Sequence, residues 1–563
     1  MKTALPILAS AALLAAMPAT AQTAAPPAGP VASLPAPARA AALTLATPAR
    51  ARPKLIVAIS VDQFSADLFA QYRNHFTGGF KRLLTGVVFP SGYQSHAATE
   101  TCPGHSTILT GMRPAHTGIV ANNWVDQSAP LDDKIIYCAE DESVPGSTHS
   151  NYTVTDKHLK VPTLGEMMKA ADPRTRVVSV AGKDRAAVMM GGHKVDELWW
   201  WNGKTYVSYA GRVQPAVVTR ANAAIAALVA GPQQALPLPA FCQALDRPIA
   251  VGDQVLGTGR FARAAGDLDA FRVSPAADAA TLSIGAGLIQ SMGLGKGPQT
   301  DIISIGASAT DYIGHAYGTQ GSEMCIQMDQ LDQALGGFFD TLDSWGLDYE
   351  VMLTADHGAH DMTERQQQHA MPMESRAAPA LSTKVADAAI AAKLGLTAPV
   401  ILAAEGDVYV NTALPAATAA KVAEAARAYY AAQPQVAAAF PRAQIAATPM
   451  PDGPPEGWTL IQRARASFDP QRSGDLLVLL KPRATTIEKP GVGYVETHGS
   501  PWDYDRRVPI LFWRKGMTGF EQPLSVETVD IAPTLAATIG LPVSGLDGRC
   551  LDLDPGTATT CPR

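Results

Sequence analysis

The stretch Lys54-Leu-Ile-Val-Ala-Ile-Ser-Val61 decides the fold. It is a nearly continuous run of apolar residues, several of them β-branched, which is the pattern of a strand buried on both faces of a parallel sheet. Similar runs recur downstream with helix-like stretches between them. Further strands are predicted at Thr175–Val180, Asp301–Ile305, Tyr349–Thr354, Asp475–Leu480 and Val508–Trp513, and helices from Ser106, over Met324–Leu342 and over Val529–Ile539. This alternation predicts an α/β fold in which helices sandwich a largely parallel central sheet.

Two stretches fit this alternation poorly and are predicted to be cap insertions over the carboxyl edge of the sheet. Residues 190–300 contain Trp199-Trp200-Trp201 followed by Ala-rich segments with Pro and Gly turns. Residues 365–470 are again Ala-rich, with helices expected at Val385–Leu394 and Ala416–Ala432. Residues 53–563 are therefore expected to form a single α/β domain with helical cap insertions.

The N-terminus has the pattern of a secretory signal peptide. Lys2 precedes an apolar run at residues 4–17, and Ala19-Thr20-Ala21 fits an A-x-A cleavage site. We expect residues 1–21 to be the signal peptide and the Ala/Pro-rich residues 22–52 to form a flexible lead-in. No later stretch is long and apolar enough to span a bilayer. The mature protein is expected to be periplasmic or secreted and without a membrane span; an uncleaved anchor is the alternative.

Composition bears on two properties: whether the protein binds nucleic acid and whether its cysteines form disulfides. The formal net charge is −6, with no basic excess, so the sequence gives little support to a nucleic-acid-binding surface. Export would place the six cysteines in an oxidising compartment, where structural disulfides are expected. The sequence does not choose among their connectivities. Only Cys550 and Cys561, which flank a short tail containing Pro and Gly, suggest a particular pair.

Aspartates and histidines follow the predicted strands. Because the carboxyl ends of parallel strands meet at one edge of the sheet, three strand ends and one loop could deliver them to a common site. The residues are Asp62, Asp311, His315, Asp356, His357 and His498. Three Asp and three His suit two zinc ions with three protein ligands each and an open position, and this mixed donor set favours Zn²⁺ over Mg²⁺ or Ca²⁺. For each residue taken alone, a helix cap or a structural role is the more ordinary interpretation.

A second motif, Thr99-Glu-Thr101-Cys-Pro-Gly-His105, begins a predicted helix. Pro103 suits the first helical position, which would place Thr101 just before the helix N-terminus. Unpaired N–H groups and the helix dipole favour a phosphate there. The alternative is that Thr101 merely caps the helix, and the local sequence alone favours that interpretation.

The ordered set of motifs resembles the alkaline phosphatase superfamily. The closest branch is the type I phosphodiesterase/nucleotide pyrophosphatase-like one, and within it the bacterial periplasmic alkaline phosphatases that have a Thr nucleophile and a Lys-x-Arg pair. The similarity spans roughly residues 54–550. The motifs are Val61-Asp62-Gln63, Thr101-Cys-Pro-Gly-His105, Gly118-Ile-Val-Ala-Asn122-Asn123, Lys183-Asp184-Arg185, Asp311-Tyr-Ile-Gly-His315, Ala355-Asp356-His357-Gly358 and Thr497-His498-Gly499.

The resemblance implies a role for each matched residue. One zinc would be bound by Asp311, His315 and His498, and the other by Asp62, Asp356 and His357, with the oxygen of Thr101 completing the second sphere. Thr101 would be the nucleophile. Asn122, preferred to Asn123 by its place in the motif, would hold a phosphoryl oxygen together with Lys183 and Arg185. His105 and His360 are interpreted as supporting or structural residues.

The function expected from this resemblance is an exported, zinc-dependent alkaline phosphatase. It would hydrolyse small-molecule phosphate monoesters through a covalent phosphothreonine, release inorganic phosphate and act as a monomer. Two cations at Lys183 and Arg185 favour monoesters, which have more oxygen charge than diesters. Acidic loops such as Asp132-Asp133 and Asp552–Asp554 are compatible with structural Ca²⁺, although solvated turns are the favoured interpretation.

Several alternatives stay open. A phosphodiesterase or nucleotide pyrophosphatase on the same site, or a secondary activity of that kind, would need an apolar pocket, which Trp199–Trp201 could supply if they were not packing residues. A sulfatase is disfavoured because Thr101 and His105 stand where that class needs Cys or Ser and Arg. A phosphoglycerate mutase would be cytosolic, and a non-catalytic scaffold would lack one of the site residues.

Overall fold

The computed structural model describes residues 51–369, 371–556 and 558–562, and within them a ten-stranded central sheet forms the core. The signal peptide expected at 1–21 and nearly all of the lead-in expected at 22–52 lie outside the described residues. In spatial order the strands are β19 (Phe520–Glu521), β2 (Val87–Tyr93), β18 (Arg507–Arg514), β11 (Tyr349–Thr354), β1 (Leu55–Val61), β10 (Asp301–Ala307), β5 (Val177–Ala181), β6 (Glu197–Trp201) and β7 (Tyr206–Val207), with β20 (Val526–Glu527) paired to β2.

The centre of this sheet is parallel, as predicted. Strand β1 pairs in parallel with β10 on one side and β11 on the other, and all seven of its residues are buried. Strands β5 and β6 continue the parallel order, whereas β18 runs antiparallel to both β11 and β2. The carboxyl ends of β1, β5, β10 and β11 therefore meet at one edge, and the loop that precedes β18 returns to it.

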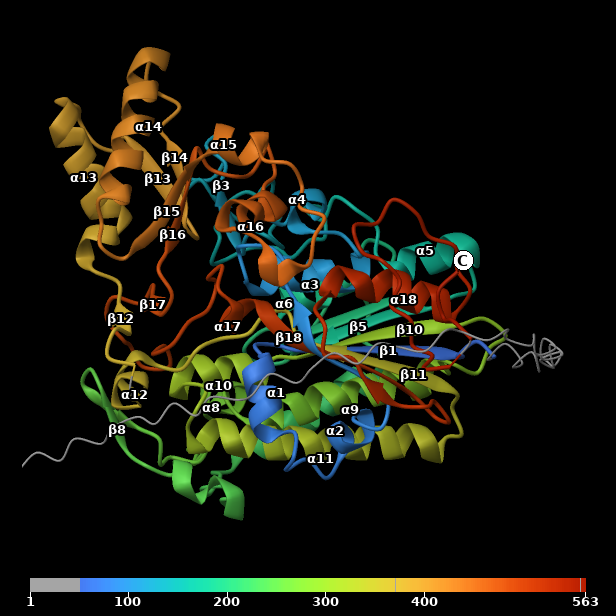
Figure 1. Cartoon of the computed structure of the whole chain (residues 1–563). Helices are drawn as coiled ribbons and strands as arrows, with labels where there is room; N and C mark the ends of the chain where they lie inside the picture. Colours follow the sequence, from blue (N-terminus) through green and yellow to red (C-terminus); the bar gives the residue numbers. More distant parts are fainter. Residues whose placement is uncertain (1–50, 370, 557, 563) are drawn as a thin grey trace, which may run out of the picture. The chain divides into compact units, whose positions relative to one another are not determined.

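Helices cover both faces of the sheet, which confirms the predicted sandwich (Figure 1). Alternate side chains of β1 belong to two different apolar clusters: Leu55, Val57 and Ile59 to one and Ile56 and Ala58 to the other. The first face packs against α1 (Ala66–Tyr72), α2 (Gly79–Leu83), α7 (Ala216–Ala230), α9 (Pro275–Met292) and α11 (Ser322–Ser344). The second packs against α3 (Thr101–Thr110), α5 (Leu164–Ala171), α6 (Asp184–Gly191) and α18 (Ile531–Thr538).

The prediction that residues 190–300 form a cap was wrong for much of that stretch. Trp199, Trp200 and Trp201 lie in β6, which extends the central sheet beside β5, and their exposed fractions are only 1–7%. Helices α7 and α9 belong to the first face rather than to a cap. The tryptophans are buried packing residues, as interpreted, but they belong to the central sheet and not to a cap. Other elements here are η1 (Ala240–Leu245), α8 (Leu268–Arg272) and the hairpin β8 (Ile249–Val251) with β9 (Gln254–Leu256).

Residues 379–480 form a separate layer, here named the cap subdomain, with its own apolar cluster around Ile390, Val422 and Tyr430. A helical cap is predicted for residues 365–470, and α13 (Thr383–Leu394) and α14 (Ala416–Ala431) confirm its two predicted helices. These helices pack on a four-stranded sheet. The remaining elements are η2 (Pro379–Leu381), β13 (Ile401–Ala404), β14 (Asp407–Val410), β15 (Val436–Pro441), α15 (Arg442–Ala447), η3 (Pro455–Gly457), α16 (Leu460–Ser467) and β16 (Leu476–Leu480).

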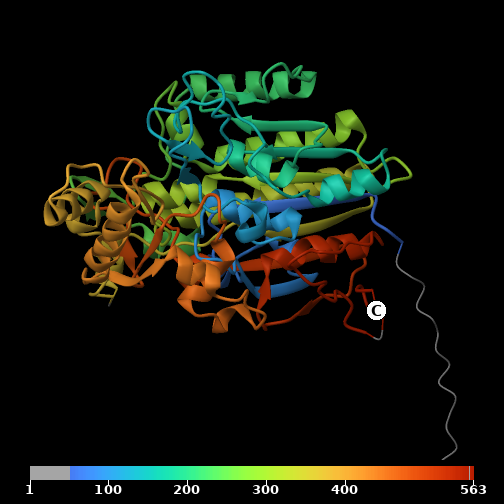
Figure 2. The ribbon, with the colours of Figure 1, turned by 90° about the horizontal axis from the view of Figure 1, so that it is seen from above.

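The predicted strand Asp475–Leu480 exists but belongs to this cap sheet as β16, not to the central sheet. An apolar run of five residues looks the same in either sheet, because pairing partners are not encoded locally. A two-stranded pair, β12 (Ser375–Arg376) with β17 (Ala484–Thr485), lies where the chain enters the cap subdomain and where it leaves it. Seen from above, the cap subdomain lies at one end of the central strands (Figure 2).

Three disulfides join the six cysteines. The predicted Cys550–Cys561 pair is confirmed, and the others are Cys102–Cys138 and Cys242–Cys325. In the described part of the chain, no helix combines the length and the apolar character needed to cross a membrane. The acidic loops have local partners: Asp133 contacts His149 at 2.6 Å, and one oxygen of Asp552 accepts the N–H groups of Asp554 and Thr560.

Candidate active site

Helix α3 presents Thr101 at its first turn, in the middle of the site. The helix begins at Thr101, with Glu100 as the extended residue before it, so the prediction that Pro103 opens the helix was wrong by two residues. Proline is tolerated anywhere in the first turn, since those N–H groups have no helical partner. Gly104 allows α3 to approach the end of β11, because a Cβ there would lie 2.1 Å from the carbonyl oxygen of Asp356. Thr101 itself is completely buried.

The three predicted aspartates converge at the carboxyl ends of the central strands. Asp62 follows β1 directly, Asp356 lies two residues beyond β11, and Asp311 lies on α10 (Ala309–Tyr317), the helix after β10. Their exposed fractions are 0–1%. The ammonium of Lys183 contacts Asp62 at 2.7 Å and Asp311 at 2.6 Å. One ammonium cannot neutralise three buried carboxylates, so this site has an excess of negative charge.

Three histidines face these carboxylates through the same ring atom. Nε2 of His315 and of His498 lies 3.4 and 3.3 Å from Asp311 Oδ1, which confirms that Asp311 and His315 share a helix face. Nε2 of His357 lies 3.4 Å from Asp62 and 3.3 Å from Asp356. In each ring Nδ1 meets a backbone carbonyl, of Glu496, Thr99 and Gly358 respectively, at 2.7, 2.9 and 3.0 Å.

A carbonyl oxygen can only accept, so the proton of each imidazole resides on Nδ1 and the lone pair of Nε2 is directed at the carboxylates. This is the arrangement that orients histidines for metal binding. Burial also lowers the pKa of His357 to about 3, which keeps its ring neutral. Burial and the neighbouring Asp356 raise the pKa of Asp62, since two carboxylates that lie together disfavour a second charge.

Several buried atoms in this cluster have no hydrogen-bond partner: Asp62 Oδ1, Asp311 Oδ1, Asp356 Oδ2 and His357 Nε2. Leaving a buried acceptor unsatisfied is costly, and a cation would satisfy all of these atoms at once. Among the residues that the structure describes, three groups of side chains have ligand atoms close enough to hold a metal ion: Asp311 with His315 and His498, Asp62 with Asp311 and His357, and Asp62 with His105 and Asp356. The donors therefore fit metal ions.

His105, interpreted from the sequence as a supporting or structural residue, lies in direct contact with this cluster. Its Nδ1 is 2.9 Å from the carbonyl oxygen of Thr101 and 3.0 Å from Asp356 Oδ2. The first contact lies within helix α3, and the second places the imidazole of His105 next to a strand-end carboxylate. His360 contacts Glu374 at 2.9 Å.

Two of the three predicted phosphate-binding residues, Lys183 and Arg185, lie beside the Thr101 hydroxyl, and the third, Asn122, contacts the residue that follows Thr101. Lys183 Nζ and Arg185 Nη2 lie 3.4 and 3.5 Å from Thr101 Oγ1, at the end of β5 and the start of α6. Burial lowers the pKa of Lys183, but Asp311 and Asp62 outweigh this effect and raise it to about 12. Asn122 accepts a hydrogen bond from the N–H of Cys102 at 2.8 Å, whereas Asn123 donates to Glu405 of the cap subdomain at 2.9 Å.

A cleft of about 500 Å³ opens over this cluster between the strand ends and the cap subdomain. Its lining includes Asn122, Arg185, His315 and His498 from around the strand ends, and Glu405 from the cap subdomain. None of the three tryptophans of β6 lines it. The sequence did not single out Glu405, Glu100 or Tyr137 as site residues. Glu405 has a left-handed backbone (φ 48°) in the β13–β14 turn before Gly406, and that turn was not recognisable as part of a distant site.

Comparisons with known proteins agree with this geometry. The model of the type I phosphodiesterase/nucleotide pyrophosphatase family matches residues 56–501. The alkaline phosphatase PhoK of Sphingomonas sp. is 60% identical over 517 residues, covering 90% of this chain and 92% of the relative. The alkaline phosphatase PhoD of Zymomonas mobilis is 48% identical over 518 residues, covering 90% and 89%. Among solved structures, wild-type alkaline phosphatase PafA matches with a TM-score of 0.77 at 26% identity, covering 89% of this chain and 99% of that one.

Proposed function

The chain belongs to the type I phosphodiesterase/nucleotide pyrophosphatase family, and we propose that it is an alkaline phosphatase that hydrolyses phosphate monoesters through a phosphothreonine at Thr101. The observation that carries this proposal is the buried Thr101 hydroxyl, which lies within 3.5 Å of both Lys183 and Arg185 beside a set of unpartnered metal-ligand atoms. The two curated phosphatases similar over nine-tenths of the chain support it.

The proposed cofactor is a pair of Zn²⁺ ions. Asp311, His315 and His498 would hold one of them, and Asp62, Asp356 and His357, with Thr101, the other. Imidazole nitrogen with carboxylate oxygen is a donor set typical of zinc. When bound, such a pair lowers the pKa of a hydroxyl and stabilises the departing oxygen.

The protein residues then supply position and charge. Thr101 Oγ attacks the phosphorus atom, and the leaving alcohol departs from the opposite side. Arg185 and Lys183 neutralise the oxygens that keep their charge in a loose transition state, and the amide of Asn122 donates to one of them. Hydrolysis of the phosphothreonine releases inorganic phosphate and restores the hydroxyl.

A secondary phosphodiesterase activity is the second candidate, because the chain belongs to a family of type I phosphodiesterases and nucleotide pyrophosphatases. The position of two cations around Thr101 supports the monoester as the main substrate, because a diester offers one fewer charged oxygen.

We also propose export to the periplasm or medium, which the three disulfides support. A monomer is proposed because one chain supplies every ligand of the site. A structural Ca²⁺ remains a proposal of the sequence alone.

The experiment that tests this function is a comparison of kcat/KM for a matched aryl phosphate monoester and diester, with zinc present, in the wild type and in Thr101→Ala. A strong monoester preference that disappears in the variant is expected. A diester preference would assign the protein to phosphodiesterases, and unchanged activity in Thr101→Ala would overturn the proposed nucleophile.

A further inference from the structure

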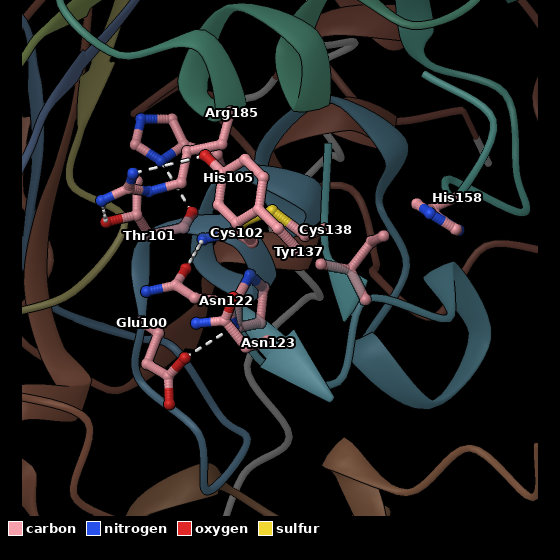
Figure 3. The surroundings of a disulfide bond; sticks show 12 residues. Glu100, Thr101, Cys102, His105, Asn122, Asn123, Tyr137, Cys138, His158 and Arg185 are labelled. Atoms are coloured by element: carbon pink, nitrogen blue, oxygen red, sulfur yellow. Dashed lines mark hydrogen bonds between the residues drawn. A yellow bond between two sulfur atoms is a disulfide. The ribbon is translucent and has the colours of Figure 1, made fainter. Parts of the chain in front are cut away.

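The disulfide Cys102–Cys138 connects two residues whose neighbours both belong to the site (Figure 3). Cys102 follows Thr101, and Cys138 follows Tyr137, the last residue of β4 (Ile135–Tyr137). Both sulfur-bearing side chains are completely buried. The bond therefore joins the first turn of α3 to a hairpin, β3 (Asn123–Val125) with β4, that would otherwise pack beside it only through non-covalent contacts.

Asn122 bridges the two halves of this disulfide. Its side-chain oxygen accepts from the N–H of Cys102 at 2.8 Å, and its backbone carbonyl accepts from the N–H of Cys138 at 2.9 Å. The N–H of Asn122 in turn donates to Glu100 at 2.6 Å. Because its oxygen is already used, the side chain of Asn122 has its NH₂ group left to donate to a substrate oxygen.

Tyr137 connects the same hairpin to Arg185. Its hydroxyl donates to Asp184 Oδ1 at 2.8 Å and accepts from Arg185 Nη1 at 3.3 Å. Tyr152 donates to the other oxygen of Asp184 at 2.8 Å, so this carboxylate fixes two phenols. The opposite guanidinium nitrogen, Arg185 Nη2, is the one that lies 3.5 Å from Thr101 Oγ1.

We propose that Tyr137 and the Cys102–Cys138 disulfide are positioning residues that fix Arg185 and Asn122 relative to Thr101. This inference rests on the proposed phosphatase function. Tyr137 holds the guanidinium by a hydrogen bond, and the disulfide holds Tyr137 and the backbone around Asn122 to the helix that carries Thr101. Such support matters because groups that stabilise a transition state must be held within about 0.5 Å of their working geometry.

A double-mutant cycle tests the role of Tyr137. Tyr137→Phe keeps the ring but removes the contacts of the hydroxyl, and is expected to lower kcat/KM for an aryl phosphate about 10-fold. In an Arg185→Ala background the same change is expected to have an effect of about 2-fold or less, since its target is gone. An equal loss in both backgrounds would show a merely structural role, and no loss in the wild-type background would also overturn the proposal.

A pair of double variants tests the disulfide. Cys102→Ala with Cys138→Ala removes the covalent link but keeps both N–H groups that Asn122 accepts. Cys242→Ala with Cys325→Ala is the matched control, because those cysteines are equally buried and lie outside the site. Both pairs are expected to lose stability, and only the first to lower kcat/KM, by about 10-fold, and to weaken inhibition by inorganic phosphate.

Equal kcat/KM in the two folded double variants would overturn the role of the disulfide. If the first variant does not fold, the Tyr137 cycle still decides the proposal. Failure of the proposed function is a separate outcome, because it would appear as a wild type with no monoesterase activity at all.

Discussion

Asp332 and the three strand-end aspartates are equally buried, with exposed fractions of 0–1%, yet their surroundings are opposite. Asp332, on α11, accepts the N–H groups of Thr77, Gly78 and Phe80 at 2.6–2.7 Å, so both of its oxygens have donors. Asp62, Asp311 and Asp356 face one another and imidazole lone pairs, and each keeps an oxygen without a hydrogen-bond donor. A satisfied buried carboxylate stabilises a loop, whereas an unsatisfied cluster indicates that a cation belongs there.

The largest effect expected from this contrast is on catalysis at the unsatisfied cluster. Asp356→Asn should lower kcat/KM for an aryl phosphate by about 1,000-fold, because the amide replaces a metal-ligand oxygen with NH₂. The fold should persist, since the remaining oxygen can still accept the N–H groups of Gln63 and His357, which lie 3.1 and 3.0 Å from Oδ1. Steady-state kinetics with saturating zinc measure this effect, and a loss below about 10-fold would contradict the metal-ligand role.

The same chemical change at the satisfied carboxylate should act on stability instead. Asp332→Asn replaces an acceptor oxygen with a donor group that faces backbone N–H groups, and should lower the free energy of unfolding by about 3 kcal/mol. Because Asp332 supports the loop between α1 and α2 and touches no site residue, kcat/KM should stay within about 2-fold of the wild type. Denaturant unfolding and kinetics on the same preparation measure both quantities. A loss of kcat/KM with an unchanged free energy of unfolding would contradict the structural role of Asp332.

The smallest effects separate two adjacent asparagines. Asn122→Ala should lower kcat/KM about 10-fold, since it removes a donor to the transferred phosphoryl group and the acceptor for Cys102. Asn123→Ala removes only an exposed contact to Glu405 and should change kcat/KM by less than about 2-fold. Parallel kinetics on the two variants are the measurement. Equal losses would indicate that the hairpin as a whole, and not the amide of Asn122, supports catalysis.

The centre of the fold was predictable because its strands are apolar on both faces. Residues 55–61 do not alternate between apolar and polar side chains, so they indicate a strand that is buried on both faces. The residues that follow such parallel strands lie at the same end of the sheet, because the strands all run in one direction. The convergence of Asp62, Asp311 and Asp356 followed from that rule. The number and type of the donors suggested two zinc ions. The family resemblance supplied the division of the ligands between the two ions and the roles of Thr101 and the phosphate-binding residues.

The periphery was not predictable for definite physical reasons. Leu476–Leu480 pairs within the cap sheet, and the tryptophans of β6 extend the central sheet, because strand partners are chosen by tertiary packing and not by local sequence. Tyr137 and Glu405 reach the site from a short hairpin and a tight turn, whose sequences have no chemical motif. The pairing of the cysteines in two of the three disulfides was also not predictable, since the spacing of cysteines in the sequence does not determine their connectivity.

The central claim is that the unpartnered carboxylates and imidazoles at the strand ends bind the metal ions on which activity depends. The most direct measurement is the metal content per chain of purified protein, determined together with monoesterase activity before and after chelation and after zinc is restored. We predict two zinc ions per chain, loss of activity with their removal and recovery on their return. A metal-free protein that retains full activity would contradict the account.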